Sequence, residues 1–565
     1  ASDVYKRQAY GLTVLTEDCL PVDFTPQRPV RVNDQWVYHS RLYTAAEFVC
    51  GRDDLELIQL NSFGCGLDAV TTDEVCELLE QGGKLYTCLK IDEVNNLGAV
   101  RIRIRSLLAA VAMRRERGIH STSHVKPYER VYYTKEMQRE RYTILAPQMS
   151  PIHFDLLEPI FRHHGCNFEV LQNDDRNAID AGLKYVNNDA CYPSITAVGQ
   201  LMEAVTSGRY DTDHLALIMS QTGGCCRASN YIAFIRRALK KAGLEHIPVI
   251  SLNANGMETN EGFRISPALL LDAAHGVVLG DLLMRCLYRV RPYELTKGSA
   301  NALHRKWRDI CIDSLTSAHP KYSYARLCRG IVADFDAFPI DETLKKPRVG
   351  VVGEILVKYM PLANNHVVDL LEREGAEAVV PDLLDFFAAT IYEQDFKRTH
   401  FGKGRTASMV AKLGVPALQR MRRPAIEALK ASRRFAPPMA IDHVAELAKP
   451  FLSIGNQYGE GWFLAGEMAE LITSGTPNIV CIQPFACLPN HVVGKGVIKA
   501  LRAAYPGANI VAVDYDPGAS EVNQLNRIKL MLTAAQRALH AEEAKNEKTA
   551  PAPTEAAEKR EPAAV

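Results

Sequence analysis

The sequence predicts an α/β protein made of tandem Rossmann-like domains, each a doubly wound parallel sheet, with one module repeated. Short apolar runs bounded by turn residues alternate with helical patterns, which is typical of βα units. A stretch with a fixed cysteine also occurs twice along the chain. The expected strands are Leu55–Gln59, Leu85–Ile91, Tyr142–Ala146, Leu215–Met219, Pro248–Leu252, Val349–Val352, Ala376–Val380, Ile479–Gln483 and Ile510–Val513.

The repeated stretch covers residues 55–111 in its first copy and residues 478–535 in its second. The first copy contains Phe63-Gly64-Cys65 and the second contains Phe485-Ala486-Cys487. An aspartate follows each cysteine 27 residues later, and both copies then reach a basic, apolar helix start. We therefore expect the end of one module followed by a complete second module.

Composition divides the chain into six expected segments. Residues 119–141 are charged and lack an apolar period, and the end of the chain is rich in Ala, Glu, Lys and Pro, which cannot bury enough apolar surface to become ordered. The segments are 1–8, which resembles a translated sequencing adapter; 9–118, the C-terminal part of the first module; 119–141, a linker; 142–345 and 346–540, the two Rossmann-like domains of the second module; and 541–565, a disordered tail.

The bulk composition argues against several classes of partner. Lys and Arg total 66 and so do Asp and Glu, so no net charge favours nucleic acid or an acidic membrane surface. Charged residues interrupt the apolar run Leu269–Leu287, which argues against a membrane span. The 14 cysteines, without a visible secretory signal, indicate free thiols in the cytoplasm. No Cys-x-x-Cys pair occurs, so any metal site must collect its ligands from distant points.

Three cysteines follow expected strands at the edge of the sheet where ligands bind in open α/β folds: Cys65, Cys226 and Cys487. A thiolate at the start of a helix has a lowered pKa and binds metals well. Before Cys226, Gly223 and Gly224 would let backbone amides approach a bound ion or sulfide. Cys191, which precedes Tyr192-Pro193, is a further loop candidate.

Spacing leaves two interpretations of these thiols. Cys191, Cys226 and Cys487 share a metal, or each is a small buried hydrophobe, as most buried cysteines are. Three cysteines suffice for three irons of a cubane and leave a fourth iron open as a Lewis acid. Packing is the expected role of Cys19, Cys50, Cys76, Cys88, Cys286, Cys311, Cys328 and Cys481, whereas either role remains open for Cys166 and Cys225.

Several stretches resemble the 2-hydroxyacyl-CoA dehydratase family, specifically the large fused proteins described as acyl-CoA dehydratase activase-related. The resemblance extends from about Leu55 to Ala535. Its motifs are Asn188–Pro193, Gln221–Tyr231, Val349–Val357, Gln483–His491 and Asp514–Gly518.

This resemblance implies Rossmann-like domains that hold a [4Fe–4S] cluster, with Cys191, Cys226 and Cys487 in the ligand positions. Related reductases hold a double-cubane cluster, for which Cys166 and Cys225 would be the additional thiolates. Cys65 would be the ligand of the first module, which lacks the earlier cysteines. The resemblance also implies an ATP-hydrolysing activase as partner, and ATP would act only through it, because this chain has no Gly-x-x-x-x-Gly-Lys-Ser/Thr loop.

Two further features have both a functional and a structural interpretation. Glu460, in Gly459-Glu460-Gly461-Trp462, is a candidate acid or base near a cluster, or an ordinary helix-start carboxylate. The basic segment Lys397–Arg434 would receive coenzyme A phosphates or an acidic face of the activase, or is a solvated helical surface.

The expected function is therefore that of an iron–sulfur component of an ATP-driven low-potential electron-transfer enzyme. By the resemblance, it would dehydrate a 2-hydroxyacyl-CoA through a ketyl radical, which makes it a lyase. A double-cubane reductase of small molecules is one alternative, and a non-catalytic electron relay or activase-docking module is another. A metal-free α/β scaffold is the remaining interpretation.

Overall fold

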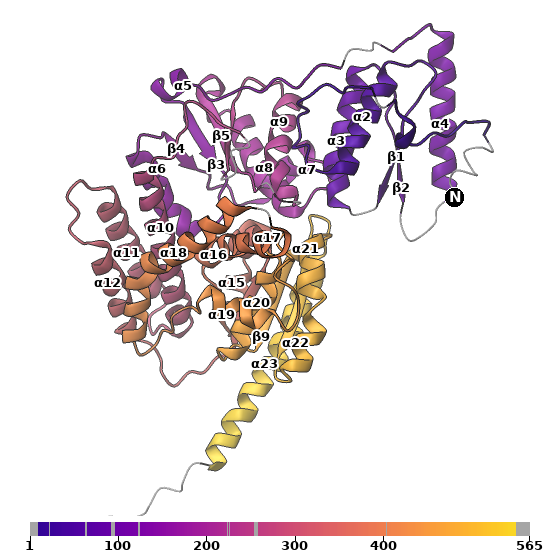
Figure 1. The fold of residues 1–565 in the computed structure, drawn as a ribbon. Coiled ribbons are helices and arrows are strands. Elements are labelled where there is room, and N and C mark those ends of the chain that lie inside the picture. The colour runs from indigo at the N-terminus through magenta and orange to yellow at the C-terminus, as the bar shows by residue number, and fades with distance from the viewer. Residues whose placement is uncertain are drawn as a thin grey trace, which may run out of the picture.

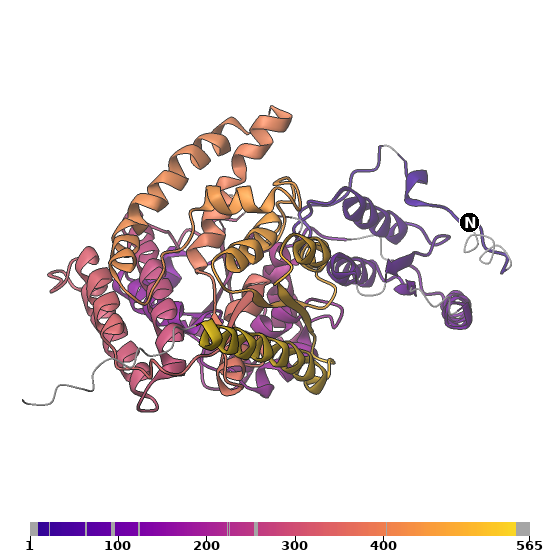
Figure 2. The ribbon, with the colours of Figure 1, turned by 90° about the horizontal axis from the view of Figure 1, so that it is seen from below.

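A computed structural model describes residues 10–21, 23–62, 65–91, 97–121, 125–222, 224, 226–253, 258–402 and 404–549. The fold class is α/β, as predicted, and every strand pairing within its sheets is parallel. Figure 1 shows the first module to one side of the second, and Figure 2 shows the same separation from below.

The described part of the first module is a two-stranded sheet with helices around it. Strand β1 (Ile58–Ser62) pairs with β2 (Thr87–Ile91), with Ile58 opposite Thr87. Its helices are η1 (Glu17–Cys19), α2 (Val37–Cys50), α3 (Gly66–Gln81) and α4 (Leu97–Glu116). Apolar side chains of α2 and α3 join the core of the second module, so the first module docks through these helices.

The first domain of the second module is a doubly wound sheet with strand order β4-β3-β5-β6. Its strands are β3 (Thr143–Ala146), β4 (Phe168–Val170), β5 (Leu215–Ser220) and β6 (Val249–Leu252). Its other elements are α5 (Lys135–Arg139), α6 (Pro151–His163), α7 (Arg176–Tyr185), α8 (Tyr192–Thr206), η2 (Thr212–His214), η3 (Arg227–Asn230) and α9 (Tyr231–Lys241).

The second domain repeats this topology, with strand order β10-β9-β7-β8. Its strands are β7 (Arg348–Gly353), β8 (Glu377–Val379), β9 (Asn478–Pro484) and β10 (Asn509–Tyr515). Its helices around the sheet are α13 (Ile355–Tyr359), α14 (Pro361–Asn364), α15 (Val367–Arg373), α20 (Trp462–Thr473), α21 (Leu488–Asn490), the π-helical turn η5 (His491–Lys495), α22 (Ile498–Ala504) and α23 (Glu521–Thr549). In each sheet the chain first adds a strand on one side of its first strand, β3 or β7, and then adds the next two strands on the other side. Such a reversal creates a switch point, where open α/β sheets bind ligands.

A helical layer packs beside the two sheets. It consists of α10 (Pro267–Val290), η4 (Arg291–Tyr293), α11 (Ser299–Thr316), α12 (Tyr324–Asp336), α16 (Leu383–Tyr392), α17 (Gln394–Phe401), α18 (Arg405–Ala431) and α19 (Ile441–Ala448). Helix α10 is the one described helix that is long and apolar enough to span a membrane. Half of its apolar stretch is buried inside the protein, and its Asp281 accepts hydrogen bonds from the backbone of Leu383 and Leu384. It is therefore a core helix of this layer.

The structure differs from the sequence prediction in one additional strand and in two segment boundaries. Strand β4 was not expected, because three residues are too few to display an alternating pattern. The expected linker 119–141 contributes Tyr133 to the core beside Ile144 and Phe168, so its end belongs to the domain. The expected tail begins too early, because α23 continues to Thr549 on helix-forming Ala, Glu and Lys; residues 550–565 lie outside the described residues.

Candidate functional site

The three cysteines of the predicted metal site each stand immediately before a helix. Cys191 is the N-cap residue of α8, Cys226 that of η3, and Cys487 that of α21. Cys226 follows β5 and Cys487 follows β9, and the two switch points lie between these strands and their neighbours β3 and β7. The strand–turn–helix order of the sequence therefore places Cys226 and Cys487 at the edges of the two sheets where ligands bind, whereas Cys191 lies in the loop between α7 and α8.

One guanidinium group connects these thiols. Burial alone would lower the pKa of Arg227, but the neighbouring charges of Cys191, Cys487, Tyr231 and Cys226 raise it. Arg227 also donates a hydrogen bond to the carbonyl oxygen of Ala486, directly before Cys487. The structure thus brings the cysteines of both sheets around a single buried cation.

The thiols are largely shielded from water. Cys191 and Cys487 are buried and Cys226 is half-buried. Burial, with the charges of Cys191 and Glu460, raises the pKa of Cys226 to about 12. Burial and Glu460 raise the pKa of Cys487 as well. The expectation that the helix starts lower these pKa values is wrong for both thiols, because desolvation outweighs the helix dipole. A bound cation would reverse the shift.

The turn that carries Cys487 is unusual in its backbone. Ala486 has a φ of 57°, a left-handed conformation that costs energy for a residue other than glycine. Behind this turn, Asp514 accepts hydrogen bonds from Gln483 (3.0 Å) and Lys495. Although burial acts in the opposite direction, hydrogen bonds from His491, Lys495 and Gln483 hold the pKa of Asp514 well below its usual range. This ion network holds the strand end and the π-helical turn together.

Two buried carboxyl groups lie beside the thiols. Glu354 follows β7, and its side chain accepts a hydrogen bond from Val357 N (2.8 Å); Glu460 accepts one from Ile355 N (2.8 Å). Burial and the charge of Glu460 raise the pKa of Glu354 to about 8. Burial also raises the pKa of Glu460. Glu460 accepts a hydrogen bond at the start of helix α13, as a helix-start carboxylate does. It also lies near Cys226 and Cys487, as an acid or base beside a cluster would.

Cys65 lies at the border of the same site. It is the N-cap residue of α3, and a Cβ atom placed on the adjacent Gly66 would come within 1.7 Å of the Arg227 guanidinium carbon. Three other described cysteines of the first module lie away from Cys65. Cys50 packs at the far end of α3 against Gly82, Cys76 lies three turns along α3 beside Glu80, and Cys88 lies within β2.

Other predicted residues have separate locations. Cys166 lies before β4, at the opposite edge of the sheet from the residues that follow β5, and packs with the core around Ile144. The carbonyl oxygen of Gly224 accepts hydrogen bonds from Gln35 (2.6 Å) and Ser229 (2.7 Å). Gly223 and Cys225 lie outside the described residues.

The eight cysteines expected to pack differ in burial. Cys50, Cys286, Cys311, Cys328 and Cys481 are buried, as predicted. Cys76 and Cys88 are half-buried, and Cys19 is exposed, so packing in a core is wrong for Cys19. Its place in the short turn η1 of the N-terminal segment explains the difference, because no buried side chain lies in that turn.

The basic segment forms α17 and α18. Its Arg422 is buried and binds Asp382 and Asp385, whereas Arg423 is exposed and pairs with Glu427. Apolar side chains are exposed on the same helices: Phe401, Met409, Val410 and Leu413. The basic residues are thus partly structural and partly solvent-facing.

Sequence reasoning did not assign a role to Arg227, Tyr231 or Glu354. Tyr231 and Cys191 lie 3.0 Å apart from hydroxyl to thiol. Glu354 directly follows β7, and Cys487 lies three residues after β9, so a place just after a strand was a usable signal for Glu354 as well. Arg227 is adjacent to Cys226 in sequence, but its contact with Gly66 depends on the packing of the first module.

Among the described residues, no three Cys, His, Asp or Glu side chains are grouped so as to hold a metal ion. No model of a known protein family matches the chain, and no curated protein matches it significantly. The dehydratase resemblance therefore depends on the motifs in the sequence itself.

Proposed function

We propose that this chain is the iron–sulfur component of an ATP-driven low-potential electron-transfer enzyme that resembles 2-hydroxyacyl-CoA dehydratase. The observation that supports this proposal is the convergence of Cys191, Cys226 and Cys487 on Arg227. A cluster differs from a single ion because each thiolate binds its own iron, so its ligands are spread around the cluster. Three free thiols from separate loops suit that arrangement in number and chemistry.

Cys191, Cys226 and Cys487 would hold a [4Fe–4S] cluster. Such a cluster supplies one-electron transfer and an open iron that can bind a substrate oxygen. A double-cubane cluster needs more thiolates, and Cys166 lies at the wrong edge of its sheet to supply one. The four-iron cluster is therefore the form that we propose.

The protein's own residues would contribute charge, proton placement and a dry environment. Arg227 offers a buried positive charge to the anionic oxygen of a thioester substrate. Glu354, with its pKa near 8, can hold or release a proton at neutral pH, and Glu460 is its partner in this role. Few water molecules can compete there, because Cys191, Cys487, Glu354 and Glu460 are buried.

The reaction in this proposal is the loss of water from a 2-hydroxyacyl-CoA. A separate activase, or one in a longer form of this protein, would hydrolyse ATP and deliver the electron. We place the protein in the cytoplasm, where thiols stay reduced.

Iron and acid-labile sulfide in the anaerobically purified chain test the cluster. We expect about four irons per chain, and their loss from the triple variant Cys191→Ala, Cys226→Ala, Cys487→Ala. The matched control is Cys19→Ala, Cys76→Ala, Cys88→Ala, which should keep its iron. Iron that survives the first variant, or is absent from the wild-type protein, would refute the cluster proposal. With activase, ATP and a 2-hydroxyacyl-CoA, no loss of water from an iron-loaded chain would favour the electron-relay alternative.

A further inference from the structure

Helices α17 and α18 form a hairpin that extends from the body of the protein, as the light orange helices in Figure 2 show. Helix α17 is anchored near its start by Phe396, whose ring would lie 2.7 Å from a Cβ atom added to Gly455. Helix α18 is anchored at Gly414, where Ile391 of α16 packs against it. Residues 397–413, which we call the hairpin end, lie beyond both anchors; residue 403 is outside the described residues.

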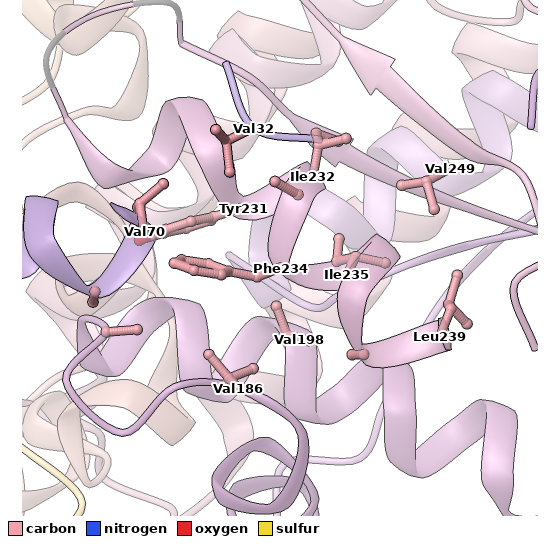
Figure 3. Close-up of a cluster of buried hydrophobic side chains, with 14 of the residues drawn as sticks. Val32, Val70, Val186, Val198, Tyr231, Ile232, Phe234, Ile235, Leu239 and Val249 are labelled. Carbon is pink, nitrogen blue, oxygen red and sulfur yellow. The ribbon is translucent and has the colours of Figure 1, made fainter. Parts of the chain in front are cut away.

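The hairpin end exposes large apolar side chains. Four of them are between 58% and 69% exposed: Phe401, Met409, Val410 and Leu413. In the core, by contrast, side chains such as Tyr231 and Phe234 gather in a buried cluster, as Figure 3 shows. Met409 and Val410 each lie one helical turn from Leu413, so these three share a face of α18. Exposed apolar residues that gather in one place mark interaction sites.

The hairpin end is also cationic. Its sequence has five basic residues and no acidic one: Lys397, Arg398, Lys403, Arg405 and Lys412. Lys412 lies 3.8 Å from the carboxylate of Asp395. Within the described parts of the chain, Lys397, Arg398 and Arg405 form no ion pair, and their side chains are exposed. The balanced charge of the whole chain therefore conceals a local excess of positive charge at this end.

Contacts within the hairpin hold its two helices together. Ser408 of α18 donates a hydrogen bond to Asp395 of α17. Gly402 and Gly404 have φ angles of 65° and 77°, a left-handed conformation that glycine adopts without strain, and they turn the chain between the helices. Phe401 directly precedes this turn. The apolar and basic side chains are therefore presented together at the free end of one helical unit.

The charge and shape of the hairpin end favour one kind of occupant. A symmetric contact with a second copy would place its cations against the same cations, which repel. A standard protein interface takes about 20–30 residues from each partner and is depleted in Lys, whereas a hairpin end is small and carries Lys. An anionic membrane surface complements both properties, because apolar side chains enter its interface while Lys and Arg bind its headgroups.

We propose that the hairpin end binds the surface of an anionic membrane. The four exposed apolar side chains enter the headgroup region, and Lys397, Arg398 and Arg405 contact anionic headgroups. Cytoplasmic membrane surfaces carry the negative charge that this contact needs. The proposal involves neither the cysteines nor iron, so it goes beyond the proposed function, and its failure would leave that function untouched.

Sedimentation of the full chain with lipid vesicles tests this proposal. Vesicles of phosphatidylcholine alone are compared with vesicles that also contain phosphatidylglycerol, which is anionic. We expect saturable binding to the anionic vesicles, about tenfold tighter or more than to the neutral ones, because each basic residue near the surface adds to the attraction. Binding should weaken as the salt concentration rises, since salt screens exposed charges. Binding of poly-glutamate but of neither vesicle would overturn the proposal and indicate an acidic protein partner.

One double variant tests the apolar contribution. Met409→Ser with Leu413→Ser should weaken binding to anionic vesicles about tenfold or more, because binding scales with the apolar area that enters the interface. The matched control is Val522→Ser with Leu530→Ser, since these side chains on α23 are 65% and 73% exposed.

A second double variant tests the charges. Arg398→Gln with Arg405→Gln should weaken binding to anionic vesicles and reduce its salt dependence. Its control is Arg139→Gln with Arg176→Gln, which removes two exposed charges from another part of the surface. The proposal is overturned if the wild-type chain binds anionic vesicles no more tightly than neutral ones, or if either hairpin variant binds as tightly as its control.

Discussion

The two copies of the repeated stretch present a cysteine at the same point of the fold but surround it differently. Cys65 precedes α3 and Cys487 precedes α21, each after a parallel strand. Strand β9 lies inside a four-stranded sheet, whereas β1 belongs to a sheet of two strands. Cys487 is 8% exposed and lies near Cys226 and Glu460, whereas Cys65 is half-buried.

The repeated motif therefore determines where a thiol stands, while the neighbouring domain determines the environment of that thiol. Among the described residues, only the second module has two four-stranded sheets whose ligand-binding edges supply cysteines to one place. The first module instead brings Gly66 against Arg227, so it closes one side of the cysteine site of the second module.

The largest effect on stability should come from the buried ion pair behind the second-module site. Lys358 Nζ lies 2.8 Å from Glu467 Oε1, and both side chains are almost fully buried. Lys358→Met leaves a buried carboxylate unpaired and should lower the free energy of unfolding by about 3–5 kcal/mol. Denaturant unfolding measures this.

The control is Arg52→Met in the first module, where Arg52 and Asp54 form an exposed pair. Its loss should be at most about 1 kcal/mol. Equal losses in the two variants would contradict the contrast between the modules.

Gly66→Ala tests the contact between the modules. The added methyl group would overlap the Arg227 side chain, which is held by Ala486. We expect a loss of about 1–3 kcal/mol from overpacking, with faster hydrogen exchange in α3 and η3. Gly51→Ala is the matched control, because its Cβ would meet only Phe48 O at 3.5 Å. If both variants exchange like the wild-type protein, Arg227 does not join the modules.

The pH dependence of stability should depend on Glu354. In the unfolded chain, the Glu354 carboxyl group loses its proton near its ordinary pKa of 4.5. In the folded chain, the pKa of Glu354 is about 8, so the carboxyl group keeps its proton to a higher pH. Folding stability from this group therefore falls as the pH rises from about 4.5 to about 8, and is constant above that. In metal-free protein, Glu354→Gln should flatten the melting temperature against pH over this interval. The exposed Glu342→Gln serves as control, and parallel curves for both variants would disprove the assignment.

The smallest effect should come from the strained turn. Ala486 has a φ of 57°, and the first copy of the repeat has Gly64 at the corresponding sequence position. Ala486→Gly should raise the free energy of unfolding by about 1 kcal/mol, because glycine adopts this conformation without penalty. Ala503→Gly, in an exposed part of helix α22, should lower it by about 0.5–1 kcal/mol. Loss of stability in both variants would argue against strain at Ala486.

The local part of this arrangement was predictable from sequence. Each expected strand is present, although the first is shifted by three residues to Ile58–Ser62. Cys226 and Cys487 stand at helix starts because each strand–turn–helix pattern is contained in a short stretch of sequence, and Cys191 lies in the short loop between α7 and α8. Such patterns need no knowledge of distant residues.

The environment of the thiols was not predictable in the same way. Burial raises the thiol pKa values, and Arg227 donates a hydrogen bond to Ala486, which is 259 positions away in the sequence. Lys358 and Glu467 are likewise 109 positions apart. Only the assembled fold determines which of these groups meet.

The most direct test of the central claim compares the iron content of anaerobically purified Cys487→Ala with that of Cys65→Ala. Our account predicts that Cys487→Ala loses most of its iron and sulfide, while Cys65→Ala keeps the wild-type content. If Cys65→Ala lost as much iron as Cys487→Ala, or if Cys487→Ala lost none, the claim that the second module alone builds the metal site would be contradicted.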